Sequence, residues 1–245
     1  MCGRFVVART IGEIAMIFEA DEVLGEYDLP SYNLAPTQNV PILVDRSFER
    51  DEHGNPLGDL SRQFHSARWG LVPRWSKGPA ETAPLFNARI ETLFEKPSFK
   101  ESVLRRRCLI PASGYFEWQV DEAGGKHPIY INAGEDGMFA FAGIYEWWAD
   151  PAKPAGAPDR WLLSASIVTK PAVAELAHIH DRNPVLLSPD TLDEWLDPSA
   201  DATPELLEAV AEMADVVAAE ALFHGVSSEV GKVSANGPQL IRAVH

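Results

Sequence analysis

The feature that most limits the fold of this chain is a series of short apolar segments, each bounded by turn residues. These segments are rich in β-branched and aromatic side chains, which is typical of strands. No regular alternation with long helices accompanies them, so a doubly wound parallel sheet is not expected. The predicted strands are residues 41–46, 67–72, 108–110, 114–120, 127–132, 138–147, 161–169 and 185–187. This pattern predicts an α+β fold with an antiparallel, barrel-like β core and short flanking helices.

Capping signals and turn residues place the remaining elements. Thr10 and Glu13 fit a capping box, which predicts a first helix over about residues 11–20. Ser188-Pro189 and Thr203-Pro204 predict the starts of two short helices, because proline suits the first helical position. The polar residues 51–59 predict a hairpin tip, and residues 149–160 predict a surface loop. We expect a single domain over residues 1–245.

Several classes of protein are excluded by composition. No apolar run approaches 18 residues, so no membrane span is expected, and the N-terminus lacks the pattern of a secretory signal. The two cysteines, Cys2 and Cys108, are too few for a disulfide scaffold or the usual structural zinc site. We therefore expect a cytoplasmic protein without a metal. Cys108 lies in an apolar strand, which indicates a buried small hydrophobe.

The net charge of −15 is unevenly distributed along the chain. Residues 61–110 carry 10 basic and 4 acidic side chains, whereas residues 1–60 carry 4 basic and 11 acidic ones. Because salt screens charges beyond about 8–10 Å, this basic middle segment can still form a local anion-binding groove. Taken by itself, this pattern favours a solvated basic face.

Cys2 has unusual chemistry because it follows the initiator methionine. Removal of Met1 would place an amine and a thiol on adjacent carbons, and about a tenth of such an α-amine is neutral at pH 7. A neutral amine attacks an aldehyde to form a Schiff base, and the thiol then closes a five-membered thiazolidine. The alternative is a disordered terminus with an incidental cysteine.

A resemblance to a known family extends along nearly the whole chain. Its motifs are MCGRF (1–5), YNLAPTQ (32–38), WGLVPRWSK (69–77), FNARIET (86–92), EKPSFK (95–100), RRCLIPASGYFEW (106–118), FAGIYEWW (141–148), IVTKPA (167–172), IHDRNPVLL (179–187) and GKVSANGP (231–238). Together they resemble the SOS response-associated peptidase family of abasic-site processing proteins. The short MCG start alone also resembles the class II glutamine amidotransferases.

The resemblance implies four catalytic residues. Cys2 is the nucleophile, Asn87 orients its amine or the lesion sugar, and Glu117 transfers protons during Schiff-base formation and sugar ring opening. His180 assists closure of the thiazolidine or its reversal. Without the resemblance, Glu117 in a strand of period two would point away from Phe116 and Trp118 towards solvent. Asn87 would then be an ordinary turn residue.

The resemblance also implies contacts with DNA. Arginine binds phosphate through paired donors, and tryptophan offers a flat face to unpaired bases. The predicted DNA-binding residues are Arg4, Pro36, Trp75, Arg89 and Trp118.

The predicted function is that of an abasic-site sensor in single-stranded DNA or at a single-strand–duplex junction. Cys2 crosslinks to the lesion as a thiazolidine, Met1 is removed by self-cleavage, and β-elimination is a side activity. We expect a monomer that needs no cofactor and associates with the nucleoid when bound to DNA. The alternatives are a thiol peptidase that acts on other proteins, a DNA junction-binding module without catalysis, and an N-terminal-nucleophile amidotransferase.

Overall fold

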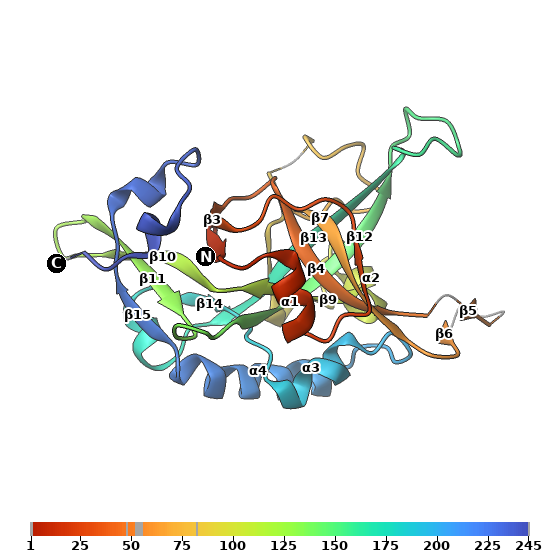
Figure 1. The fold of residues 1–245 in the computed structure, drawn as a ribbon. Coiled ribbons are helices and arrows are strands. Elements are labelled where there is room, and N and C mark those ends of the chain that lie inside the picture. The colour runs from red at the N-terminus through yellow and green to blue at the C-terminus, as the bar shows by residue number, and fades with distance from the viewer. Residues whose placement is uncertain (1, 48, 52–55, 82, 245) are drawn as a thin grey trace.

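Five strands close on themselves into a barrel in the computed structural model, which describes residues 1–245 except 1, 48, 52–55, 82 and 245 (Figure 1). The ring runs from β13 through β12, β9, β4 and β7 and back to β13. Its pairings are antiparallel except for the closing one, where β7 and β13 run parallel with Arg68 opposite Ser164. The barrel strands are β4 (Asn39–Arg46), β7 (Ser61–Trp69), β9 (Arg107–Ala112), β12 (Phe139–Ala149) and β13 (Trp161–Pro171).

The remaining strands extend this barrel or form a second sheet. β2 pairs with β7, and both β8 and β14 pair with β13. A five-stranded antiparallel sheet has the order β15-β11-β10-β1-β3. The bounds are β1 (Phe5–Val7), β2 (Glu22–Leu24), β3 (Ser31–Leu34), β5 (Glu49–Arg50), β6 (Pro56–Leu57), β8 (Asn87–Arg89), β10 (Gly114–Val120), β11 (Lys126–Asn132), β14 (Arg182–Pro184) and β15 (Leu222–Gly225).

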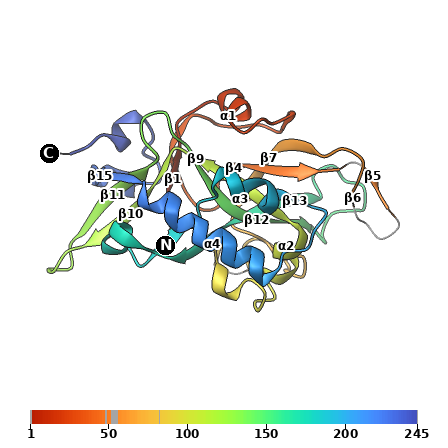
Figure 2. The ribbon, with the colours of Figure 1, turned by 90° about the horizontal axis from the view of Figure 1, so that it is seen from below.

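Helices cover the outside of the sheets. The two C-terminal α-helices, α3 and α4, run beneath them (Figures 1 and 2). The α-helices are α1 (Ile11–Ile17), α2 (Lys100–Arg105), α3 (Pro189–Leu196) and α4 (Pro204–Ala219), and the 3₁₀ helices are η1 (Ile90–Thr92), η2 (Ala174–His178), η3 (Ser228–Gly231) and η4 (Pro238–Ile241). No helix in the described part of the chain is long and apolar enough to cross a membrane.

Two hydrophobic clusters hold the elements together. The larger one fills the barrel and includes Phe5, Trp69 and Phe141, whose rings meet edge to face. The smaller one lies between the five-stranded sheet and the C-terminal segment, where Phe116 packs with Val230. Strand β10 is therefore covered on both faces, which determines the surroundings of Glu117.

The predicted α+β fold with a barrel-like core is confirmed, and the range 114–120 is strand β10. The predicted strand at 185–187 is wrong, because the regular strand is Arg182–Pro184 and only Leu186 forms an isolated bridge. The apolar residues 185–187 resemble a strand in the sequence because their side chains are buried in the core. Strand β7 begins six residues earlier than the predicted start at residue 67 and ends three before the predicted end at residue 72.

Helix lengths also differ from the prediction. The capping box of Thr10 and Glu13 is present, but α1 ends at Ile17 rather than near residue 20. The helix after Thr203 is 16 residues long and not short. A hairpin is present, because β5 and β6 pair, but the predicted tip at 51–59 is too long, since β6 (Pro56–Leu57) lies within it; residues 52–55 lie outside the described residues. Residues 150–160 form a loop between β12 and β13, so the predicted loop at 149–160 begins one residue too early, because Ala149 is the last residue of β12.

Candidate functional site

Cys2 lies three residues before β1 and is held by its backbone. Its carbonyl accepts a hydrogen bond of 2.8 Å from Asn87 Nδ2, which comes from β8. Phe5 pairs with Tyr115 in the antiparallel β1–β10 ladder. Continuing that register towards the N-terminus brings Cys2 alongside residues 117 and 118. The two residues predicted to act together, Cys2 and Asn87, are therefore in direct contact.

The Cys2 thiol is fully buried. Burial raises the pKa of this thiol well above its ordinary value, and the nearby carboxylate of Glu117 raises it further. Its Sγ lies 4.0 Å from the carbonyl oxygen of Arg4, a weak hydrogen bond at most. The thiol consequently remains protonated near neutral pH and needs a base to become a nucleophile.

Glu117 is buried, with only 3% of its surface exposed, on the face of β10 opposite Phe116. The strand's alternation is as predicted, but the solvent-facing orientation is wrong, because the chain covers both faces of β10. Burial raises the pKa of the carboxyl to about 7. A carboxyl with this pKa can both donate and accept a proton at neutral pH.

His180 completes the group from the segment that follows η2. Its Nε2 lies 3.9 Å from Glu117 Oε2, and its Nδ1 accepts a hydrogen bond of 3.0 Å from the backbone N–H of Arg182. Nδ1 also lies 2.8 Å from the exposed Asp181 carboxylate. Burial lowers the pKa of the imidazole. Nε2 is therefore the ring nitrogen that faces Glu117.

An open cavity of about 500 Å³ adjoins this group. It is lined by Glu117, Trp118, Val120, Lys126, His180 and Gly231. Sequence reasoning missed Lys126 and Gly231 as parts of this wall. A larger cavity of about 680 Å³ includes Glu26 and Asp28 among its lining and touches none of the four predicted catalytic residues. We assign the chemistry to the smaller cavity, because two of the four predicted catalytic residues, Glu117 and His180, line it.

The predicted DNA-binding residues are placed differently from one another. Arg89 is exposed on β8, two residues after Asn87, and Trp75 is 66% exposed. Trp118 lines the cavity, and Pro36 is half-buried in the turn after β3.

Arg4 is instead engaged with the C-terminal segment. Its Nη1 donates to the carbonyl of Val230 at 2.7 Å and to Asn33 Oδ1 at 3.0 Å, and its Nη2 donates to the carbonyl of Gly231 at 3.2 Å. Gly231 belongs to the cavity wall, so Arg4 links the N-terminal motif to that wall. Its predicted contact with phosphate stays a prediction.

Comparison with known proteins identifies the family. Residues 1–233 match the model described as SOS response associated peptidase (SRAP), and the chain belongs to this family. It is 37% identical over 245 residues to the abasic site processing protein YoqW of Bacillus subtilis (strain 168), covering 99% of this chain and 100% of that protein. The abasic site processing protein HMCES of Gallus gallus is 29% identical, covering 86% of this chain and 66% of that protein.

The fold is also found among solved structures. A crystal structure of a protein from Bacteroides thetaiotaomicron superimposes with a TM-score of 0.76 and 22% identity, covering 100% of both chains.

Proposed function

We propose that this protein recognises abasic sites in single-stranded DNA, or at a single-strand–duplex junction, and crosslinks itself to them through Cys2. The observation that supports the proposal is that Asn87 contacts Cys2, that the Glu117 carboxylate lies near the Cys2 thiol, and that Glu117 and His180 line one open cavity. The printed names of the relatives, which refer to abasic site processing, point to the same substrate.

The first step requires a free amine on Cys2. Hydrolysis of the Met1–Cys2 peptide bond, an autopeptidase activity, supplies it. An abasic sugar is mostly a closed hemiacetal, so a proton must move from its hydroxyl to the ring oxygen to release the aldehyde. Glu117, with its pKa near 7, can pass this proton. The Cys2 amine then adds to the aldehyde, and loss of one water gives an imine.

The second step closes the ring. The Cys2 sulfur adds to the imine carbon, the thiol proton is removed, and the imine nitrogen gains a proton, so no other atoms enter or leave. His180 suits the removal of the thiol proton, because its pKa is low enough to leave the imidazole neutral at pH 7. Asn87 holds the Cys2 carbonyl throughout and so orients the amine.

The product is a thiazolidine that shields the lesion from strand breakage during the response to DNA damage. An imine acidifies the neighbouring C–H, so β-elimination is a lyase side activity of the same intermediate. The protein acts as a monomer, needs no cofactor, and associates with the nucleoid through the damaged DNA.

The alternatives have less support. A peptidase acting on other proteins needs a reactive thiolate, whereas burial raises the pKa of the Cys2 thiol. An amidotransferase shares only the short N-terminal motif with this chain, whereas the family match extends over residues 1–233. A DNA junction-binding module without catalysis gives no reason for the buried carboxyl of Glu117 next to His180.

The test is the intact mass of the protein after incubation with an abasic oligonucleotide. The adduct should weigh as much as the protein without Met1 plus the oligonucleotide, less one water. Cys2→Ala should give no heat-stable adduct, and Cys2→Ser a weaker, more reversible one. Cys108→Ala is the matched control, because this second cysteine is equally buried but lies in β9. Undiminished crosslinking by Cys2→Ala would remove the basis of the proposal.

A further inference from the structure

The loop that follows β7 is fastened to the barrel at several points. The backbone N–H of Val72 donates to Ser164 Oγ at 2.9 Å, and the carbonyl of Ser76 accepts 2.7 Å from Trp148 Nε1. Ser76 also donates its N–H to the carbonyl of Pro73 within the loop. These bonds hold residues 72–76 in one conformation, although Arg74 and Trp75 in their midst are exposed.

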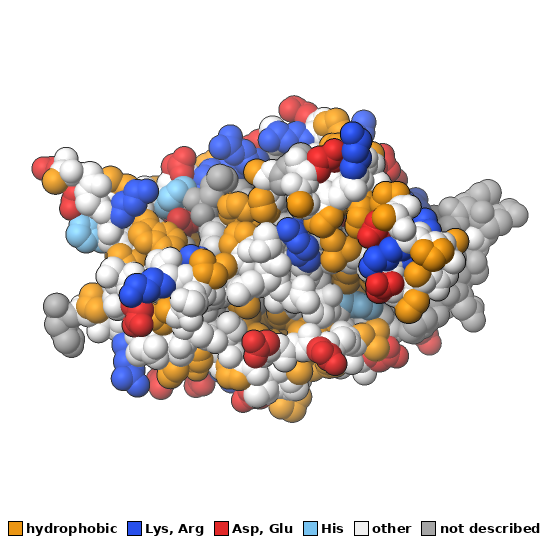
Figure 3. All heavy atoms as spheres, turned by 90° about the horizontal axis from the view of Figure 1, so that it is seen from above, with side chains coloured by type: hydrophobic (Ala, Val, Ile, Leu, Met, Phe, Trp, Pro, Cys, Tyr) orange, Lys and Arg blue, Asp and Glu red, His pale blue; other side chains and the backbone are white. Residues whose placement is uncertain are grey.

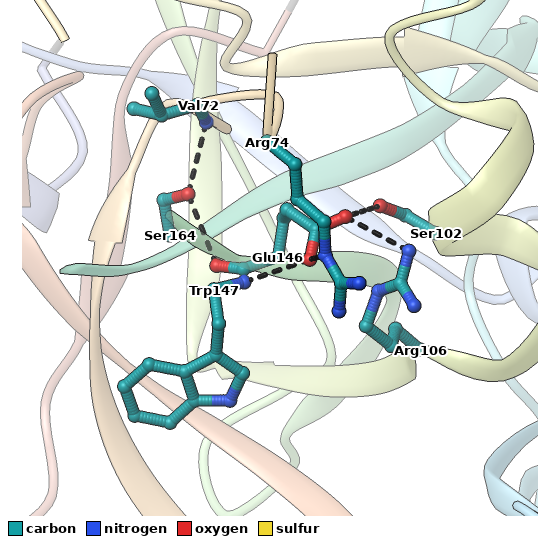
Figure 4. A network of polar contacts seen from close by, with 7 residues as sticks. All are labelled: Val72, Arg74, Ser102, Arg106, Glu146, Trp147 and Ser164. Atoms are coloured by element: carbon teal, nitrogen blue, oxygen red, sulfur yellow. Dashed lines mark hydrogen bonds and ion pairs between the residues drawn. The ribbon is translucent and has the colours of Figure 1, made fainter. Parts of the chain in front are cut away.

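Arg74 turns back from this loop towards Glu146, a buried carboxylate on β12 (Figure 4). Its Nε donates 2.8 Å to Glu146 Oε1, which also accepts from the N–H of Trp147. The other oxygen, Oε2, accepts 2.8 Å from Arg106 Nη2 and 3.3 Å from Ser102 Oγ. Both carboxylate oxygens therefore have two donors each.

Glu146 does not need Arg74 to balance its charge. Arg106, whose side chain is 18% exposed, already pairs with the carboxylate, whereas the side chain of Arg74 is 62% exposed. Two guanidinium groups on one carboxylate leave one positive charge in excess. Within the described part of the chain, Arg74 is bonded through Nε alone, so its two terminal nitrogens remain as donors for an anion.

The sheet relates this cluster to the candidate active site. On β13, Ser164 lies opposite Glu146, and Ile167 lies beside Asn87. Three residues of strand span roughly 10 Å, which is the separation along β13 between these two positions. Figure 3 shows Lys and Arg side chains, with acidic side chains among them, along the edge at the top of the picture.

We propose that Arg74, positioned by Glu146, binds a backbone phosphate of the DNA strand next to Trp75. This inference rests on the proposed function. An exposed arginine ordinarily loses side-chain entropy when it binds. Here the bond from Nε to Glu146 already restricts the side chain, which remains 62% exposed. Trp75 is 66% exposed on the same loop and offers a face for a neighbouring base.

The experiment measures binding of an undamaged single-stranded oligonucleotide by fluorescence anisotropy over a series of salt concentrations. Arg74→Gln should weaken binding by about three- to tenfold and lower the slope of log affinity against log salt by about 0.7, the value for one phosphate contact. Arg46→Gln is the control. This substitution removes the same charge from an exposed arginine. Arg46 lies opposite Ser61, which is eight residues along β7 from Trp69, a distance of roughly 26 Å. Its slope should equal that of the wild type.

A second variant, Glu146→Gln, tests the role of Glu146 by whether DNA binding becomes tighter or weaker. Glu146→Gln adds one unit of positive charge, so general electrostatic attraction predicts tighter DNA binding. The positioning role predicts weaker binding, because Arg74 loses its anchor. Arg74→Gln keeps Glu146 paired with Arg106 and gives an answer even if Glu146→Gln does not fold.

Equal affinity and slope for Arg74→Gln and Arg46→Gln would overturn the inference. Crosslinking of abasic DNA by Arg74→Gln at saturating concentration would still leave the proposed function standing. If the wild-type protein binds no DNA at all, both the inference and the proposed function are wrong.

Discussion

At the residue scale, the most unusual group is the carboxyl of Glu117. Its ordinary pKa is 4.5, and burial raises it to about 7. Between these two pH values the folded protein holds a proton that the unfolded chain has released, so the stability contributed by this group falls as pH rises. Above pH 7 the folded state carries a buried charge, at a cost of about 3 kcal/mol.

We therefore expect Glu117→Gln to be more stable than the wild type at pH 8, by up to about 3 kcal/mol, and close to it at pH 4.5. Urea denaturation at the two pH values measures this difference. The same variant should slow formation of the borohydride-trappable imine by about 10²–10⁴-fold, because Gln cannot transfer the proton. Glu208→Gln, an exposed position on α4, is the control and should change neither quantity. A Glu117→Gln variant that forms the imine at the wild-type rate would contradict the assigned role.

His180 should act after Glu117. His180→Ala is expected to form the imine but to convert it slowly to the borohydride-resistant thiazolidine, because the thiol proton then lacks an acceptor. A time course with and without borohydride separates the two species. His178→Ala is the matched control, since this exposed histidine lies two residues away and its ring is not in the cavity wall. If His180→Ala accumulates no excess imine, the division of roles is wrong.

At the element scale, strand β10 shows what the sequence could predict. Its range, 114–120, follows from β-branched and aromatic residues between turn residues, and the alternation of Glu117 against Phe116 follows from the period of two. The burial of Glu117 could not be predicted, because periodicity does not reveal a second layer over a sheet. On the Glu117 face of β10, its neighbour Tyr115 belongs to the larger cluster, which includes residues as distant in sequence as Ile167 and Val168, while Val226, Val230 and Leu240 cover the Phe116 face.

One buried amide makes several of the hydrogen bonds that hold the C-terminal segment. Asn33 Nδ2 donates to the carbonyls of Lys232 and Ala235 at 2.9 Å and of Val230 at 3.3 Å, while Oδ1 accepts from Arg4. The motifs containing Asn33 and the segment 231–238 were both noted in the sequence. Their contact could not be predicted, because about 200 residues separate them.

Asn33→Ala should destabilise the protein by about 1–3 kcal/mol, because buried carbonyls lose their donor. Limited proteolysis should cut residues 228–241 faster than in the wild type, and urea denaturation should show the loss of stability. Asn39→Ala, an exposed position at the start of β4, serves as the control. Unchanged proteolysis of the segment in Asn33→Ala would show that other contacts hold it.

At the scale of the whole molecule, the chain carries −15 charges and yet its segment 61–110 is net positive by 6. This segment supplies Arg74 and Arg89, both exposed, and the structure brings Arg89 next to the candidate active site through Asn87 on the same strand. The charge pattern was visible in the sequence. The sequence could not predict which basic residues are free to bind DNA. Arg4, Arg62 and Arg107 differ from Arg74 and Arg89 only in the contacts that they make in the folded protein.

The last prediction concerns Arg89 and follows from its position. Arg89 lies two residues after Asn87 on β8, so both side chains leave the strand on the same side. A phosphate bound by Arg89 would hold the strand near Cys2 without reading its bases. Arg89→Ala should therefore weaken binding by a similar factor for every single-stranded sequence and lower the salt slope by about 0.7.

Anisotropy titrations with four oligonucleotides of different base composition, each at three or more salt concentrations, measure both effects of Arg89→Ala. Arg46→Ala removes the same charge from an exposed position remote from β8 and should leave the slope unchanged. The net charge of the whole molecule repels DNA. A steep loss of affinity with rising salt should therefore come only from the phosphates that the local basic site contacts. A flat salt response of the wild type, or a loss in Arg89→Ala confined to one sequence, would show that base contacts dominate instead.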